Sequence, residues 1–103
     1  MLAARPLTTK AIPDLTGFDS LRELTLGWFA FEQIPNEVFE ITTLQTLVVL
    51  NCPITEVSDR IGQLSNLRAL SIRGGDLRRI PNSVLELNRL SYLDLAKNQI
   101  ARA

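Results

Sequence analysis

The segment LRELTLGWFAFEQIPNEVFEITT, residues 21–43, is the first of three consecutive 23-residue segments that align without gaps. LQTLVVLNCPITEVSDRIGQLSN follows at 44–66, and LRALSIRGGDLRRIPNSVLELNR follows at 67–89. Seven columns are apolar in all three segments. In the first segment they are Leu21, Leu24, Leu26, Phe31, Ile34, Val38 and Ile41. A fixed period of this length indicates a solenoid, in which each unit buries its apolar edge against the next.

The period extends less regularly on both sides of these segments. Residues 90–103, LSYLDLAKNQIARA, begin a fourth unit, and AIPDLTGF within residues 1–20 is a shortened echo of QIPNEVFEI. We therefore expect a single domain over 1–103, with 1–20 as a degenerate N-terminal cap or repeat and 90–103 as a truncated last repeat. The apolar residues expected to form an uncapped edge of this last repeat are Leu90, Leu93, Leu95 and Ile100.

The pattern LxxLxLxx, followed by IPNEVFEI or IPNSVLEL, resembles the 23-residue variety of the leucine-rich repeat (LRR) between Phe18 and Ile100. The resemblance implies an α/β solenoid. A short, curved parallel β-sheet would line the concave face, and short helices or turns would cover the convex face. Local chemistry agrees, because Pro35 and Pro81 suit the first turn of a helix, where a missing N–H costs nothing.

The ninth position of such repeats usually carries an inward-pointing Asn that hydrogen-bonds the backbone of the turn. Here the fourth unit has it as Asn98, and the second has Cys52, a substitution that the family accepts. Phe29 and Gly75 hold this position in the other two units and cannot make such a side-chain bond. Backbone or water must then satisfy those turns. Cys52 is expected to be a buried, inert thiol.

The aromatic stretch GWFAF, residues 27–31, is divided by the same register. Phe31 falls in an apolar column and Phe29 at the inward ninth position, so both are assigned to the core. Trp28 falls in the eighth column, which is expected to face solvent where the strand ends. It is therefore either a surface anchor for a partner or a residue folded over the N-terminal cap. The other members of its column are Asn51, Gly74 and Lys97.

The outward columns of the expected strands suggest a binding surface. Val48 and Leu50 are apolar where a strand should face water, and Arg73 flanks them one unit later. An apolar patch with a charged rim is typical of a protein-binding site, although single exposed aliphatic residues are ordinary. The predicted partner-binding residues are Trp28, Val48, Leu50, Arg73 and Tyr92.

The residue inventory disfavours catalysis. The chain has no His and one Cys, so it cannot build a His-based triad, a His metal site or a CxxC pair. We predict a non-catalytic module that binds a protein partner through its concave face, without a cofactor or metal. Eleven basic and eleven acidic residues give zero net charge, which does not favour nucleic acid. Charged residues interrupt every apolar run, so no membrane segment is expected.

Compartment and assembly follow from the same residues. A single cysteine and the absence of a signal-like start favour the cytoplasm, with a fragment of a secreted effector as the alternative. Residues 1–51 carry three basic and six acidic groups, whereas residues 52–103 carry eight and five. The alternative function is therefore a structural unit, or a piece of a longer LRR protein, that associates end to end through the edge at 90–100.

Overall fold

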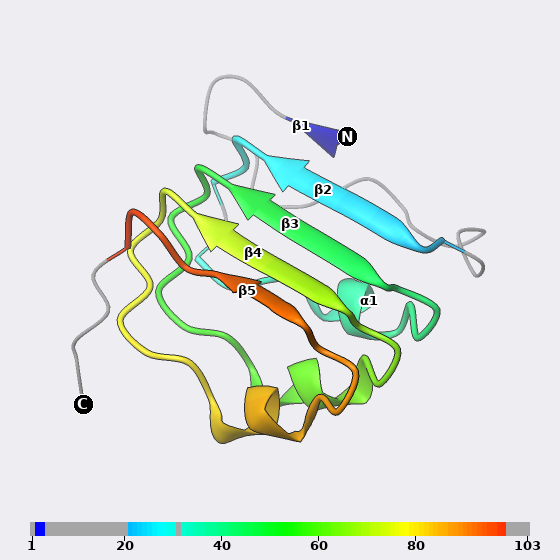
Figure 1. Cartoon of the computed structure of the whole chain (residues 1–103). Helices are drawn as coiled ribbons and strands as arrows, with labels where there is room; N and C mark the ends of the chain where they lie inside the picture. Colours follow the sequence, from blue (N-terminus) through cyan, green and yellow to red (C-terminus); the bar gives the residue numbers. More distant parts are fainter. Residues whose placement is uncertain (1, 4–20, 31, 99–103) are drawn as a thin grey trace.

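The computed structural model describes residues 2–3, 21–30 and 32–98 of the chain. Their strands form one parallel sheet in sequence order, and each coil returns behind the sheet before the next strand begins (Figure 1). Phe31, Ile100 and most of the expected N-terminal cap lie outside the described residues. The strands are β1 (Leu2–Ala3), β2 (Glu23–Gly27), β3 (Thr46–Leu50), β4 (Ala69–Arg73) and β5 (Tyr92–Asp94).

The register of the sheet is the register of the repeat. Leu24 pairs with Leu47, Leu47 with Leu70, and Leu70 with Leu93, each 23 residues further along the chain. Equivalent columns therefore stack directly beside one another, about 4.8 Å apart. We call the sheet face turned away from the core the concave face, following the solenoid that the sequence predicts.

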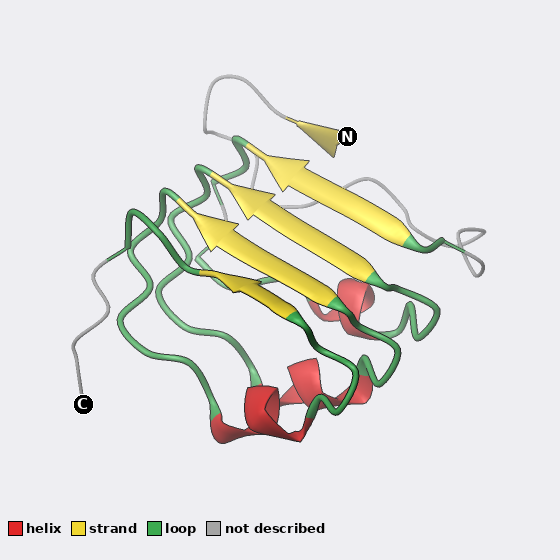
Figure 2. Ribbon diagram, in the orientation of Figure 1, coloured by secondary structure: helices red, strands yellow, loops and turns green. Residues whose placement is uncertain are grey.

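Three short helical segments lie on the side opposite the sheet (Figure 2). They are α1 (Asn36–Phe39) and the 3₁₀ helices η1 (Asp59–Gln63) and η2 (Asn82–Glu86). Pro35 and Pro81 precede α1 and η2 as N-caps with extended ψ angles of 142° and 155°. The expectation that they lie in the first helical turn is therefore wrong by one residue. Proline fixes φ but leaves ψ open, and the carbonyl of each accepts the first helical hydrogen bond.

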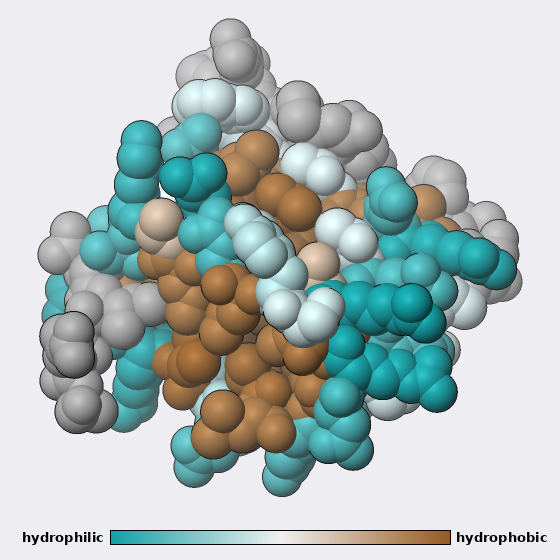
Figure 3. Space-filling view, viewed as in Figure 1, coloured by the Kyte–Doolittle hydropathy of each residue, from teal (hydrophilic) through white to brown (hydrophobic). Residues whose placement is uncertain are grey.

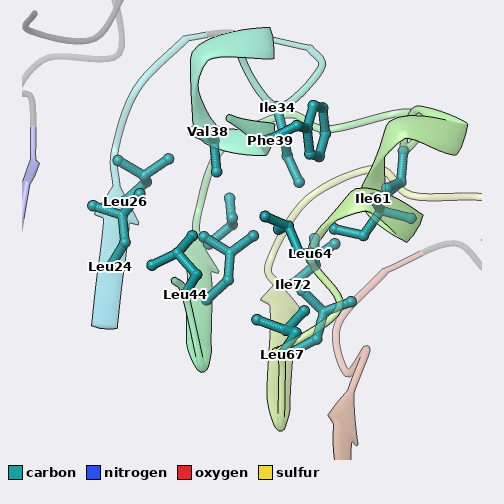
Figure 4. Close-up of a cluster of buried hydrophobic side chains, with 14 of the residues drawn as sticks. Leu24, Leu26, Ile34, Val38, Phe39, Leu44, Ile61, Leu64, Leu67 and Ile72 are labelled. Carbon is teal, nitrogen blue, oxygen red and sulfur yellow. The ribbon is translucent and has the colours of Figure 1, made fainter. Parts of the chain in front are cut away.

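The core fills the space between the sheet and these helical segments (Figure 4). In the three full segments, every described member of the seven apolar columns is buried, except Leu21 and Ile80, which pack partly buried against the same cluster. Phe29 is buried as predicted. Phe39 is also fully buried, although its column contains no regular apolar residue: Gly62 and Leu85 follow it. Burial of each large side chain stabilises the fold by about 1.5–3 kcal/mol.

The ninth-position side chain of the fourth unit supports the turn of the preceding unit. Asn98 Oδ1 accepts hydrogen bonds from the N–H groups of Gly75 and Leu77, and Nδ2 donates to the carbonyl of Ile72. The turn at Gly75 is thus satisfied by the next unit rather than by water. Cys52 is buried, as expected, and its thiol donates to the carbonyl of Leu50 at 3.4 Å.

Candidate binding surface

Two half-buried aliphatic side chains lie in the middle of the concave face. Val48 and Leu50 alternate along β3 with the fully buried Leu47 and Val49, so they point to the opposite side of the sheet. Leu50 pairs with Arg73 on β4. The structure therefore places three of the predicted binding residues next to one another.

Trp28 stands at the rim of this face rather than on a strand. It follows β2 with φ 68°, in the left-handed region, and the equivalent residues Asn51, Gly74 and Lys97 also have positive φ. The N–H groups of the first three eighth-position residues continue the sheet: Trp28 donates to Leu50 O at 3.1 Å, Asn51 to Arg73 O at 2.9 Å, and Gly74 to Ala96 O at 3.4 Å. Trp28 is partly buried. The repeat thus requires a left-handed turn at this column, where a bulky residue is unusual.

Arg73 and Tyr92 are linked by a residue that the sequence did not single out. Asp94 Oδ2 lies 3.3 Å from Arg73 Nε and accepts a 3.4 Å hydrogen bond from the Tyr92 hydroxyl. The other carboxylate oxygen accepts a hydrogen bond from Ala96 N–H at 3.1 Å. Tyr92 is 56% exposed. Asp94 therefore connects the two predicted residues across β4 and β5, although they come from different columns.

Ser71 departs from the outward pattern of its column. It is 7% exposed, although it is the equivalent in β4 of Val48, whose column is predicted to face solvent. Its cross-strand neighbours are Val48 and Asp94, and Asp94 is tied to Arg73. Neighbouring side chains on a sheet lie close enough to cover a small residue between them. This part of the concave face is therefore more closed than the column pattern predicted.

A shallow depression lies where β3 and β4 end. Its volume is about 180 Å³, and its lining is Leu50, Asn51, Arg73, Gly74 and Lys97. Sequence reasoning identified two of these residues for the site through their strand positions. The other three, Asn51, Gly74 and Lys97, are eighth-position residues of the turn that follows each strand. All three have positive φ, and the periodicity of the sequence does not predict this backbone conformation.

The one thiol of the chain, Cys52, is buried in the core and is not accessible for reaction. Burial raises the pKa of Cys52 above its ordinary value of 9.0, and hydrogen bonds from the backbone of Phe29 and Trp28 act in the opposite direction. A buried thiol with a raised pKa is a poor nucleophile. Within the described part of the chain, no group of His, Cys, Asp or Glu could hold a metal ion. None of its helices is long and apolar enough to cross a bilayer.

The chain is similar to parts of two curated proteins and to one solved LRR structure. No family model matches the sequence. The chain is 35% identical over 52 residues, half of its length, to the disease resistance-like protein DSC1 of Arabidopsis thaliana. It is 25% identical over 89 residues, 84% of its length, to the flightless-1 homolog of Caenorhabditis elegans. The solved structure of the Leptospira interrogans LRR protein LIC12759 superposes with a TM-score of 0.68 at 20% identity, over 91% of this chain.

These matches cover small parts of longer proteins. The chain spans 4% of the Arabidopsis protein, 7% of the nematode protein and 33% of the Leptospira chain. They therefore bear on the repeat rather than on the activity of those whole proteins. The 23-residue register, the parallel ladder and the structural match together show that the chain has the fold of a leucine-rich-repeat solenoid.

Proposed function

We propose that this solenoid is a non-catalytic module that binds a protein partner through its concave face. The observation that carries the proposal is the contiguous row formed by Leu50, Arg73 and Asp94, with Val48 beside it and Trp28 at the rim. Aliphatic side chains beside an exposed arginine and aromatic residues have the composition of a binding surface. Leucine-rich-repeat proteins in general act as interaction scaffolds, which agrees with this assignment.

Three features support binding over catalysis. The sequence has no His, its one thiol is buried, and the depression on the concave face is smaller than the roughly 300–1,000 Å³ of typical small-molecule pockets. A single buried cysteine also suits a reducing compartment, so we propose a cytoplasmic site of action. Zero net charge makes a protein a more suitable partner than nucleic acid.

A charge placed between the aliphatic side chains of the concave face tests the proposal. We expect Val48→Lys to abolish capture of a partner from an extract of the source organism, because a desolvated ammonium would oppose apolar contact. Gln63→Lys is the matched control, since Gln63 is exposed on η1, on the opposite side of the coil. Affinity should then be measured with the purified captured protein. Equal binding by wild type and Val48→Lys would refute a concave-face site.

A second candidate function is end-to-end association through the last coil. Hydrophobic residues gather between β5 and η2 in Figure 3, and two leucines there, Leu85 and Leu93, are 79% and 42% exposed. Exposed apolar patches of this kind occur at association surfaces. Light scattering of wild type and Leu93→Glu at rising concentration distinguishes this function: association predicts a growing mass for wild type alone, whereas a constant monomer mass would exclude it.

A further inference from the structure

The depression at the ends of β3 and β4 has the size of a side-chain pocket. At about 180 Å³ it can hold one side chain of a partner, not a whole small ligand. The depression lies directly beside Leu50. A partner residue that enters it would therefore place the next residue of the partner over Leu50 and Val48.

Gly74 lets the side chain of Asn51 pack against its backbone at the depression. It has φ 73°, and a Cβ atom at this position would collide with the side chain of Asn51. In the next unit the equivalent residue is Lys97, whose left-handed backbone places it on the same lining. The lining is therefore closed by the turn residues of three successive units, Asn51, Gly74 and Lys97.

The charges around the depression are unequal. Arg73 and Lys97 supply two cations, and Asp94 supplies one carboxylate. Asp94 is already engaged, with Oδ2 at Arg73 Nε and Oδ1 at the N–H of Ala96. Within residues 21–30 and 32–98, Lys97 has no ion-pair partner. A guanidinium has five N–H donors, so Arg73 can hold a second carboxylate while it keeps Asp94.

We infer that this depression binds the carboxylate of an acidic residue in a partner segment, and that a large apolar residue beside it packs on Leu50 and Val48. The inference deepens the concave-face function proposed above and depends on it. Asp94 orients the guanidinium of Arg73, and Lys97 adds an ammonium from the next unit. The partner is recognised by an acidic–apolar pair of side chains.

A peptide-display selection on the immobilised chain tests this inference. The probe is a random library of 12-residue peptides, selected at low salt. We expect enrichment of Asp or Glu next to a large apolar residue. A synthesised enriched peptide should bind Arg73→Gln/Lys97→Gln at least about tenfold more weakly than wild type, because hydrogen bonds to charged groups are lost. Its Glu→Gln version should bind wild type with a similar loss, and the double variant with little further loss.

The matched control is Arg68→Gln/Arg78→Gln. Arg68 and Arg78 are exposed, and neither lines the depression. Their replacement by Gln removes the same net charge as the Arg73→Gln/Lys97→Gln variant. Measured at physiological salt, the affinity for the enriched peptide should stay within about twofold of wild type, since distant surface charges are then largely screened. Equal losses of affinity in this control and in Arg73→Gln/Lys97→Gln would overturn the inference, because only net charge would then matter.

Two other outcomes separate this inference from the proposed function. Enriched peptides that lack an acidic residue, yet lose binding to Val48→Lys, would overturn the carboxylate pocket and leave concave-face binding in place. A selection that enriches no peptide would count against both. Thermal melts guard against misfolding: Arg73 is exposed, so loss of its ion pair should change stability little.

Discussion

Asn98 Oδ1 accepts a 3.2 Å hydrogen bond from the backbone N–H of Gly75, the equivalent residue 23 positions earlier. The ninth-position side chain therefore holds the turn of the preceding coil as well as its own. Its amide nitrogen also donates to the carbonyls of Leu95 and Ala96 in the same coil. One side chain thus joins two units at the end of the sheet.

We predict that Asn98→Ala lowers the free energy of unfolding by about 1–3 kcal/mol, because partly buried backbone groups lose their partner. Urea unfolding measures the change. Asn88→Ala is the control, since Asn88 is exposed and should change stability by less than about 0.5 kcal/mol. Equal effects of the two substitutions would show that the bonds at Asn98 do not support the turn.

Gly75 provides a second prediction: Asn, the residue that this repeat usually carries at the ninth position, should destabilise the chain here. A Cβ atom at Gly75 would lie 2.5 Å from the carbonyl oxygen of Cys52 and 3.3 Å from the nitrogen of Ile54. Gly75→Ala and Gly75→Asn should therefore both destabilise the chain, by about 1–3 kcal/mol, although Asn is the usual residue at this position.

Gly27→Ala is the matched control for this substitution. A Cβ atom at Gly27 would meet its nearest neighbour, Leu50 O, at 3.8 Å, which is ordinary contact. Thermal melts should place Gly27→Ala near wild type and both Gly75 variants well below it. A Gly75→Asn variant as stable as wild type would mean that the turn has room for a side chain.

The inner columns of the sheet provide the third prediction. Leu47 and Leu70 are fully buried and pair with each other across β3 and β4. Either Leu→Ala change should cost about 2–5 kcal/mol through lost burial and a residual cavity. Leu85→Ala, on the exposed side of η2, should cost far less. Denaturant midpoints measure the difference, and similar midpoints for all three variants would contradict the assigned core.

The buried thiol predicts a dependence of stability on pH. Burial raises the pKa of Cys52 in the folded chain above its ordinary value of 9.0. The unfolded thiol ionises first, so its contribution to stability is present below pH 9 and is lost as the pH rises above it. We expect wild type to lose more unfolding free energy than Cys52→Ala between pH 7 and 10. An identical loss would show that the thiol titrates as in the unfolded chain.

The sequence predicted those features that repeat and missed those that depend on one pair of units. The columns of Leu24 and Leu26 recur, so periodicity alone found the strands, their register and the core. Asp94 was missed because its role comes from Arg73 one strand away, and Ser71 because its neighbours cover it. Such contacts join residues of different columns, and no alignment of a chain with itself reveals them.

The last prediction uses two substitutions of Trp28 to separate the effect of its backbone conformation on stability from the effect of its side chain. The φ of 68° at Trp28 lies in the left-handed region, which costs an L-residue about 1–2 kcal/mol and costs glycine almost nothing. Trp28→Gly should therefore be more stable than Trp28→Ala by about 1 kcal/mol, although both remove the indole. At Thr25, within β2, the order should reverse, because glycine weakens a strand. Urea unfolding of the four variants decides the matter. If Trp28→Ala is the more stable of its pair, the turn is not left-handed at this residue, and the indole is not held at the rim in the way that concave-face binding requires.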